Sequence, residues 1–323
     1  MIKTRIKNWI KNIINSLPYV KTLKRRIDEL KENKPLYPPG HFYSPIPSRD
    51  DILKREKQIF DNPNTELYGI DLNEKEQLEL LKKLSKFYEA FPYLSKAKEG
   101  LRYDLDNVYY YDSDAIFLYS MMRHFKPTRI VEIGSGFSSA LMLDTNEYFL
   151  ENKTRCCFID PYPQRLLSVL KESDKNNIKI ISKCTQDVEM EVFQQLQEND
   201  ILFIDSSHVA KIGSDVNFIL FEILPKLNKG VLIHFHDIFY PFVYPKQWVL
   251  NGRAWNEIFI LRAFLQYNSS FKIILFNTFL ETHHADWFSS NMPLCLKKRS
   301  RCFSKSGSVW LRKIIETEDK NVK

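Results

Sequence analysis

The stretch TRIVEIGSGFSSA, residues 128–140, decides the fold. Its first half, 130–133, is rich in β-branched residues and predicts a strand that runs directly into a turn containing Gly134 and Gly136. Both glycines can take positive φ and let a ligand approach the backbone, while Ser138 and Ser139 are placed to open a helix with free N–H groups. A plain strand-to-helix turn uses glycine as readily, so the loop alone does not decide between a ligand site and a connection.

The composition is that of a globular protein: 323 residues, 44% hydrophobic, 27% charged and 14% aromatic. This length suits one large α/β domain with additions, or two smaller domains. The five cysteines include no C-x-x-C pair, so we expect reduced thiols in a cytoplasmic protein. No apolar run approaches membrane-spanning length, and the N-terminus lacks the apolar core of a signal peptide.

The formal charge of +7 is concentrated at the N-terminus. Eight basic residues and no acidic one precede Asp28, so the rest of the chain is close to neutral. A neutral body without a basic groove predicts no nucleic-acid partner. The eight are Lys3, Arg5, Lys7, Lys11, Lys21, Lys24, Arg25 and Arg26.

Residues 2–17 place apolar side chains at helical spacing opposite basic ones, which predicts a basic amphipathic helix. Such a helix can lie on an anionic membrane surface, or it can pack on a second copy in a homo-oligomer or on the body of the protein. Packing is slightly favoured. Pro18 interrupts the pattern, and a second charged helix follows up to Lys34.

Four segments are predicted: a basic helical arm over 1–34, a Pro-rich segment and helical cap over 35–110, a core domain over 111–315, and a tail over 316–323. Five prolines in 35–47 exclude regular helix there, yet its large side chains predict an ordered segment laid over the body. Helical periodicity covers 49–60, 73–90, with Asn73 as N-cap, and 112–124.

From residue 130 onward, apolar strands alternate with helices, which predicts a parallel sheet covered on both faces. Ligands of such open sheets bind at the carboxyl ends of the strands, beside the point where strand order reverses. The expected strands are 130–133, 156–159, 178–181, 201–204 and 231–235, and the helices between them are 141–150, 164–171, 188–197 and 214–224.

The residues that follow these strands are unusually polar. Asp160 lies 24 positions beyond Gly136, where a carboxylate that binds ribose hydroxyls is expected in a nucleotide-binding βαβ unit; capping of a helix is the alternative. The strand-end set comprises Glu132, Gly134, Ser135, Gly136, Asp160, Gln186, Asp187, Asp205, His208, His236 and Asp237.

Taken in order, these motifs resemble the class I S-adenosylmethionine-dependent methyltransferases. The resemblance covers about 110–315 and rests on E-x-G-x-G at 132–136, Asp160, Gln186-Asp187, and L-x-K-G-V-L-I-x-x-H-D ending at Asp237. FIDSSH at 203–208 and HFHDIF at 234–239 look most like the bacterial branch that often accompanies sugar and polysaccharide biosynthesis. A Rossmann dehydrogenase would want G-x-G-x-x-G, and position 139 is Ser.

The resemblance implies a Rossmann-like sheet of seven strands, the last antiparallel, with 271–277 and 308–313 as the remaining strands. It also implies S-adenosylmethionine as cofactor. Gly134 and Gly136 would lie under the methionine part, Asp160 would hold the ribose and Asp187 would approach the adenine. The implied cofactor residues are Glu132, Gly134, Ser135, Gly136, Asp160, Gln186, Asp187 and Asp205.

Methyl transfer to a hydroxyl needs a base or a metal, because a sugar hydroxyl is a poor nucleophile at neutral pH. Asp205, His236 and Asp237 end adjacent strands, like the metal-binding acids of catechol-type and some sugar O-methyltransferases. Those enzymes bind magnesium, but imidazole at His236 favours zinc, iron or manganese. The alternative is a metal-free general base, His208 or His236, oriented by Asp205 or Asp237. His234 is expected to be a packed core histidine.

Residues 239–257 are dense in aromatic side chains, which suit stacking on a sugar ring. The predicted acceptor residues are Tyr240, Tyr244, Trp248, Arg253 and Trp255; packing against 35–47 is the alternative. Residues 279–306 are expected to form an acceptor lid whose basic cluster, Lys297, Lys298, Arg299 and Arg301, meets a phosphate or stays solvated. His283 and His284 are either substrate contacts or solvated.

The sequence thus predicts a cytoplasmic methyltransferase, most consistent with O-methylation of a saccharide or nucleotide-sugar. Docking at a membrane through residues 2–17 is the alternative to packing of that helix. One alternative keeps the cofactor but methylates nitrogen or oxygen of a small natural product. The other is a catalytically silent scaffold that kept the fold at a membrane.

Overall fold

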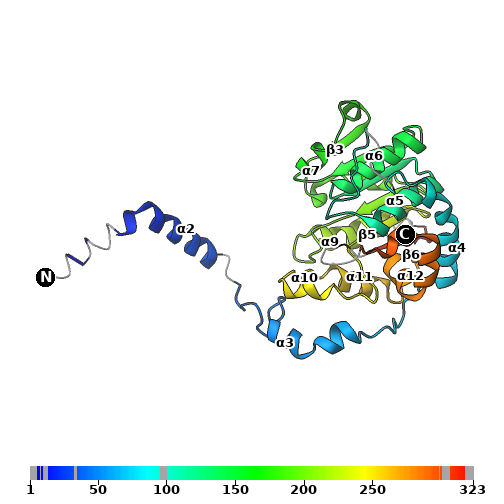
Figure 1. The fold of residues 1–323 in the computed structure, drawn as a ribbon. Coiled ribbons are helices and arrows are strands. Elements are labelled where there is room, and N and C mark those ends of the chain that lie inside the picture. The colour runs from blue at the N-terminus through cyan, green and yellow to red at the C-terminus, as the bar shows by residue number, and fades with distance from the viewer. Residues whose placement is uncertain are drawn as a thin grey trace, which may run out of the picture. The chain divides into compact units, whose positions relative to one another are not determined.

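The computed structural model describes residues 6–7, 9, 14–32, 35–94, 100–297, 299 and 306–316. The chain divides into two compact units, Met1–Glu56 and Lys57–Lys323 (Figure 1). The expected boundaries at 34 and 110 differ from this division, because residues 57–94 and 100–110 belong to the same unit as the sheet.

In its described residues the first unit contains the helices α2 (Pro18–Glu32) and α3 (Arg49–Lys54). Of the amphipathic stretch 2–17, residues 6, 7, 9 and 14–16 are helical and residue 17 is a bend, and the others lie outside the described residues. The Pro-rich stretch has turns in place of regular structure, as expected, and Tyr37 stacks on His41 at 4.6 Å between ring centres. Its docking on the second unit stays a prediction.

The second unit is built on a seven-stranded sheet with the order β3-β2-β1-β4-β5-β7-β6. The first five strands are parallel, and β7 runs antiparallel to both β5 and β6, so the predicted sheet is confirmed. The strands are β1 Arg129–Ile133, β2 Arg155–Ile159, β3 Ile178–Ile181, β4 Ile201–Ile204, β5 Leu232–His236, β6 Phe271–Phe276 and β7 Ser308–Lys313.

Helices cover both faces of this sheet (Figure 1). Crossovers between parallel strands are right-handed, so the steps β1 to β2 and β4 to β5, which run in opposite directions, put α6 and α9 on opposite faces. The α-helices are α4 Glu74–Leu84, α5 Asp112–Phe125, α6 Phe137–Phe149, α7 Gln164–Leu167, α8 Glu191–Gln194, α9 Asp215–Phe218, α10 Lys246–Leu250, α11 Glu257–Leu265, α12 Asn277–His283 and α13 Ala285–Asn291.

Short helical segments of other types extend several of these helices or stand between them. A π-helical stretch, Ile219–Ile223, continues α9, and a 3₁₀ stretch, Ser85–Ala90, continues α4. The others are Lys57–Asp61, Glu172–Asn176, Thr185–Asp187, Leu224–Lys226 and Pro293–Leu296.

Asn73 precedes α4, as expected, but it does not cap the helix with its side chain. Its backbone lies in the left-handed region at φ 51°, and its amide donates to the carbonyl oxygen of Asp71 at 3.1 Å. Asparagine tolerates this conformation better than most residues, so its contribution is to the turn before the helix.

The helical cap is part of the sheet unit because it joins the backbone of the sheet directly. Gln77 of α4 is fully buried, and its side-chain oxygen accepts from the backbone N–H of Phe276 at 2.6 Å. Tyr93 donates its hydroxyl to Asp144 of α6 at 2.6 Å. These buried contacts bridge 51 to 199 positions of sequence, which no local pattern announces.

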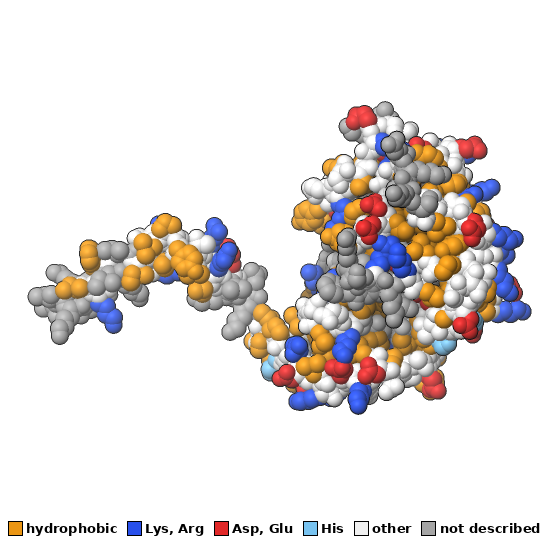
Figure 2. Space-filling model, viewed as in Figure 1, with side chains coloured by type: hydrophobic (Ala, Val, Ile, Leu, Met, Phe, Trp, Pro, Cys, Tyr) orange, Lys and Arg blue, Asp and Glu red, His pale blue; other side chains and the backbone are white. Residues whose placement is uncertain are grey.

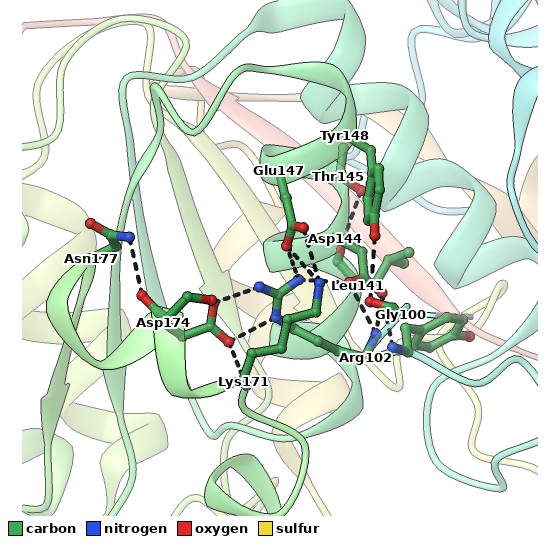
Figure 3. A network of polar contacts seen from close by, with 12 residues as sticks. Gly100, Arg102, Leu141, Asp144, Thr145, Glu147, Tyr148, Lys171, Asp174 and Asn177 are labelled. Atoms are coloured by element: carbon green, nitrogen blue, oxygen red, sulfur yellow. Dashed lines mark hydrogen bonds and ion pairs between the residues drawn. The ribbon is translucent and has the colours of Figure 1, made fainter. Parts of the chain in front are cut away.

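Arg102 holds the segment that leads to α5 against the sheet unit (Figure 3). Its side chain is 3% exposed and pairs with three carboxylates: Asp144 at 2.8 Å, Glu147 at 2.6 Å and Asp174 at 2.5 Å. Bonds from Lys171 and Arg102 lower the pKa values of Glu147 and Asp174 despite the burial that opposes their charged forms. The network fixes the position of residues 100–103. These residues come shortly before the ones that line the main cavity, which is described below.

Arg102→Ala is expected to lower the free energy of unfolding by about 3–5 kcal/mol, because it leaves the buried carboxylates of Asp144 and Asp174 without their cation. Urea unfolding measures the loss. Lys226→Ala removes an exposed pair with Glu222 and should change stability by only about 0.5 kcal/mol. Equal effects of the two substitutions would show that the network contributes nothing special.

Four cysteines lie in the described part of the chain, and all are free thiols: Cys156, Cys157, Cys184 and Cys295. Burial raises the pKa of the Cys156 thiol to about 12, so that thiol is protonated at neutral pH and packs as an apolar group. Within the described ranges, none of the helices combines the length and apolarity needed to cross a bilayer.

Candidate active site

A cavity of about 910 Å³ lies at the carboxyl ends of β1, β2, β4 and β5, beside the point where strand order reverses between β1 and β4. This is where an open α/β sheet is expected to bind its ligands. Ten of the residues predicted from sequence line it: Gly134, Ser135, Asp160, Asp205, His208, His236, Asp237, Trp248, Arg253 and Trp255.

Glu132 stabilises the glycine loop, the turn after β1 that contains Gly134 and Gly136. This side chain is fully buried, and its two carboxylate oxygens accept hydrogen bonds from Ser138 and Ser139. Ser139 in turn accepts from the backbone N–H of Gly136 at 2.9 Å. Burial raises the pKa of Glu132 to about 8. Glu132 does not line the cavity, so it positions the loop and does not contact a ligand there.

The two loop glycines have different roles. Gly134 has φ +78°, and a Cβ atom there would lie 2.0 Å from the backbone oxygen of Asp205. Gly136 is extended, and a Cβ would meet the flexible side chain of Arg165 at 2.7 Å. The expectation of positive φ therefore holds at Gly134 alone, where close approach between the β1 and β4 ends excludes any side chain.

Asp160 lies at the end of β2 and lines the cavity. Its Oδ2 accepts from the backbone N–H and the hydroxyl of Ser135, at 2.9 and 3.0 Å, and its Oδ1 accepts from the backbone N–H of Tyr162 at 2.7 Å. The carboxylate therefore bridges two loops of the cavity. Each oxygen keeps acceptor capacity toward the cavity, so the ribose-binding role stays a prediction.

Gln186 and Asp187, predicted near the cofactor, lie outside the residues that line the cavity. The Gln186 amide donates to the carbonyl oxygen of Gly213 at 2.9 Å. The 3₁₀ turn Thr185–Asp187 points Thr185 into the cavity wall in their place. The cofactor contacts of Gln186 and Asp187 stay predictions.

A cluster of acids and histidines forms the floor of the cavity at the ends of β4 and β5. The Oδ1 atom of Asp205 lies 3.2 Å from Nε2 of His208 and 3.3 Å from Nδ1 of His236. Oδ2 of Asp237 lies 3.6 Å from Nε2 of His208. His208 and Asp237 both have left-handed backbones, at φ 59° and 57°. Non-glycine residues in this region store strain, which often accompanies function.

His208 is fixed by a buried acid from α11. Its Nδ1 lies 2.7 Å from Oε2 of Glu257, whose other oxygen accepts from Ser206 at 2.9 Å. Burial disfavours the imidazolium, but the bonds to Asp205 and Glu257 outweigh this effect and raise the pKa of His208 to about 10. The charge of His236 and the hydrogen bonds from His208 and His236 outweigh the burial of Asp205 and hold its pKa well below its usual range.

His236 is held in a parallel way by Asp114 of α5, whose Oδ2 lies 3.4 Å from its Nε2. Neighbouring carboxylates raise the pKa of His236 well above its usual value, against the effect of burial. His234 is fully buried and stacks on Phe203 at 4.1 Å between ring centres, and burial lowers its pKa. His234 is therefore a packed core residue, as expected.

The predicted metal ligands Asp205, His236 and Asp237 lie together in the floor of the cavity, since Nδ1 of His236 is 3.3 Å from Oδ1 of Asp205 and 3.8 Å from Oδ2 of Asp237. Among the described residues, Asp205, His208 and Asp237 each offer a ligand atom, and these atoms lie within 4.8 Å of one another. His208 is therefore a further candidate ligand, and the set with His236 stays a prediction. The turn after β4 brings His208 back over its own strand, and Glu257 then fixes it.

The acceptor side of the cavity contains three of the five predicted residues: Trp248, Arg253 and Trp255. Tyr244 is buried behind them, and its hydroxyl accepts from the backbone N–H of Ile258 at 3.2 Å. Tyr240 packs beside Phe279 and lies outside the cavity lining. The aromatic stretch therefore supplies a wall from alternate residues, and its tyrosines support that wall or pack elsewhere.

In its described residues, 279–297, 299 and 306, the predicted lid is mostly helical, with Phe279, Leu280 and Phe288 buried. Arg299 pairs with Asp112 at 2.7 Å and is not a solvated cation; Lys298 and Arg301 lie outside the described residues. Ser306 does line the cavity. His284 pairs with Glu74 at 2.9 Å, and His283 lies against Tyr240, so neither contributes to the lining.

The two acids that hold the site histidines were not predicted as their partners. Asp114 lines the cavity and Glu257 lies outside its lining. Both are in the first turns of helices, α5 and α11, where an acidic residue is ordinarily explained by its favourable interaction with the helix dipole. Arg165 places its guanidinium 4.1 Å from the ring centre of Tyr109, and both line the cavity next to the glycine loop. Only the tertiary fold brings these residues together.

Comparison with known proteins agrees with this geometry. Residues 131–238 match the model of a family described as a methyltransferase domain. The chain is similar to an uncharacterized protein of Archaeoglobus fulgidus, with 37% identity over 171 residues, which cover 51% of this chain and 76% of the relative.

Two solved structures are also similar. The S-adenosylhomocysteine-bound methyltransferase PaMTH1 of Podospora anserina is 16% identical over 84% of this chain and 99% of its own, with a TM-score of 0.40. The O-methyltransferase TomG of Streptomyces achromogenes, involved in tomaymycin synthesis and solved with S-adenosylmethionine, is 13% identical over 73% and 90%, with a TM-score of 0.41. From the family match, the archaeal relative and its own strand order, the chain belongs to the class I S-adenosylmethionine-dependent methyltransferases.

Proposed function

We propose that this methyltransferase transfers a methyl group from S-adenosylmethionine to a hydroxyl of a saccharide or nucleotide-sugar. The observation that carries the proposal is the cluster of Asp205, His208 and Asp237 in the same cavity as the glycine loop. In such a transfer the acceptor oxygen attacks the sulfonium methyl in line, the sulfur–methyl bond breaks, and S-adenosylhomocysteine leaves. The hydroxyl proton must go to a base, and the cluster supplies carboxylates and imidazoles for it.

The same cluster fits a divalent metal. Asp205, His208 and Asp237 would hold the ion, and Glu257 on Nδ1 of His208 is the buried outer carboxylate that usually orients a histidine ligand. Two carboxylates with one imidazole suit manganese, iron or zinc better than magnesium. A bound ion would supply Lewis acidity that lowers the pKa of the acceptor hydroxyl. Metal-free proton transfer to His208 is the alternative, and it requires that residue to lose its proton first.

A saccharide is supported by the acceptor wall, where Trp248, Trp255 and Arg253 combine apolar rings with a polar group. A small natural product bearing an aromatic hydroxyl is the competing acceptor. It would be recognised by apolar stacking and would gain nothing from the guanidinium of Arg253.

Calorimetric titration with S-adenosylmethionine and S-adenosylhomocysteine, before and after chelation, tests the cofactor and metal together. Micromolar affinity, near 8 kcal/mol, is expected for both compounds. Added manganese or zinc should bind wild-type protein and should bind Asp205→Asn at least tenfold more weakly. Failure of both compounds to bind under any metal condition would contradict the proposal.

We further propose that the methyltransferase is a cytoplasmic protein whose N-terminal unit meets an anionic membrane surface. Trp9, Leu17 and Tyr19 are 65%, 49% and 73% exposed, and basic side chains lie among hydrophobic ones along this unit (Figure 2). Such a combination favours anionic lipid. Vesicles with phosphatidylserine should retain the full chain, and neutral vesicles should not. A light-scattering mass of twice the chain, without vesicle binding, would favour a homo-oligomer.

A further inference from the structure

We infer that the acceptor carries an oxyanion, a carboxylate or a phosphate, and that Arg253 binds it. This inference rests on the proposed transfer to a small polar acceptor. It concerns a part of the cavity distant in sequence from the glycine loop and formed by the segment after β5. It narrows the acceptor from saccharides in general to acidic ones.

The guanidinium of Arg253 lies against the rings of two tryptophans. Its guanidinium carbon lies 4.2 Å from the ring centre of Trp248 and 4.8 Å from that of Trp255, and the two indoles meet nearly edge to face, at 82°. Its backbone N–H donates to the carbonyl oxygen of Trp248 at 3.1 Å. A guanidinium held by ring faces is pre-oriented, so it loses less rotamer entropy on binding a ligand.

The polar edge of this guanidinium is free for a ligand. In the described part of the chain, no carboxylate pairs with Arg253, and its side chain takes part in no hydrogen bond. Its contacts with the two indoles leave the N–H donors of the guanidinium without a hydrogen-bond partner among the described residues. A planar fork of this kind matches the two oxygens of a carboxylate or phosphate.

The charges around Arg253 explain why an arginine is needed there. The cavity is lined by five aspartates: Asp114, Asp160, Asp205, Asp215 and Asp237. An anionic acceptor entering such a cavity would be repelled unless a cation faced its charged end. The other lining arginine, Arg165, lies against Tyr109 and the Cα of Gly136, on the cofactor side of the cavity.

Trp255 lies between Arg253 and the cluster of Asp205, His208 and Asp237. The ring of Trp255 lies 4.3 Å from the ring of His208 and 4.8 Å from the guanidinium of Arg253. The distance from Arg253 to His208 is therefore at most the sum of these two, which one monosaccharide can span. An acidic sugar can place its oxyanion on Arg253 and a nearby hydroxyl at the cluster.

This arrangement changes the expected use of the tryptophans. Trp255 contacts His208 and Arg253, and Trp248 contacts Arg253 and Trp255, so a cation already occupies ring faces that a neutral sugar would stack on. The two indole rings therefore pack against the guanidinium of Arg253 and hold it in place. Acceptor recognition then depends on charge at one end and on the cluster at the other.

The test measures binding of simple probes to the protein saturated with S-adenosylhomocysteine, at fixed ionic strength. The probes are glucuronate, glucose 1-phosphate and neutral glucose, followed by calorimetry and by the fluorescence of the tryptophans. At least one anionic probe should bind about tenfold or more tightly than glucose. A preference for glucuronate identifies a carboxylate acceptor, and a preference for glucose 1-phosphate identifies a phosphorylated one.

Arg253→Gln should remove this preference and leave the affinity for S-adenosylhomocysteine unchanged, and Arg253→Lys should restore only part of it. Arg262→Gln, on α11 and outside the cavity lining, is the matched control and should keep the preference. Equal binding of charged and neutral probes to the wild type, or an unchanged preference in Arg253→Gln, would overturn the inference. Loss of cofactor binding in the wild type would instead contradict the proposed function, so the two failures are distinguishable.

Discussion

Gly134→Ala is expected to weaken S-adenosylmethionine binding at least about 100-fold, the largest effect of any single methyl group added to this chain. The new Cβ would lie 2.0 Å from the backbone oxygen of Asp205 and would occupy a backbone with φ +78°. The left-handed strain costs about 1–3 kcal/mol, and the clash involves backbone on both sides, so it can be relieved only by moving the β1 loop away from the end of β4. Calorimetry with S-adenosylhomocysteine measures the loss.

Gly136→Ala is the matched control. Its Cβ would meet only Cδ of Arg165, at 2.7 Å, and that side chain can rotate away. Affinity should fall by no more than about tenfold. Both variants should unfold cooperatively, which a thermal scan checks. If Gly134→Ala binds the cofactor as tightly as Gly136→Ala, the close approach of the two strand ends has no importance for the site.

The strands of the sheet were predictable because most are short apolar runs, and the central ones are buried on both faces. Burial of all four residues of β4, Ile201–Ile204, is the direct expression of that pattern. Helix lengths were less predictable: the expected helix over 188–197 is only Glu191–Gln194, since turns at its two ends satisfy the periodicity equally well.

The candidate site was predictable where it follows strand ends and unpredictable where it depends on side chains from distant helices. Asp205 and Asp237 follow β4 and β5 and meet as expected, because parallel strands end at one edge. Glu257 reaches His208 from 49 positions away, and Asp114 reaches His236 from 122 positions away, so neither partnership leaves a local pattern.

Arg253 was predictable from the sequence as a residue of the site, but its contacts were not. Its neighbourhood of aromatic residues was evident from sequence, and it was assigned to a sugar-binding wall. That the tryptophan rings would clamp the arginine, and so change what the wall can recognise, depends on a turn in which Arg253 bonds back to Trp248. The composition of the stretch shows which residue types such a wall contains. Only the path of the backbone determines which of their side chains face the ligand.

Asp237→Asn is expected to reduce turnover by about 10²–10⁴-fold while S-adenosylhomocysteine affinity changes by less than about threefold. The carboxylate lies 3.6 Å from His208 and 3.8 Å from His236, and none of its hydrogen bonds in the described residues reaches the glycine loop. Asparagine tolerates the left-handed backbone at φ 57° as aspartate does, whereas alanine would add strain, so Asn isolates the lost charge. Turnover is measured as S-adenosylhomocysteine formed with an acceptor that the wild type methylates.

Asp187→Asn is the control, because Asp187 also follows a strand of the sheet but lies outside the cavity lining. It should retain turnover at saturating cofactor, and a loss of cofactor affinity alone would support its predicted contact with the adenine. If Asp237→Asn instead lost cofactor binding and turnover together, Asp237 would belong to the cofactor half of the cavity. A negative charge at the end of β5 is needed in either arrangement of the cluster, as a metal ligand or as the group that stabilises a protonated histidine, so unchanged turnover would exclude both.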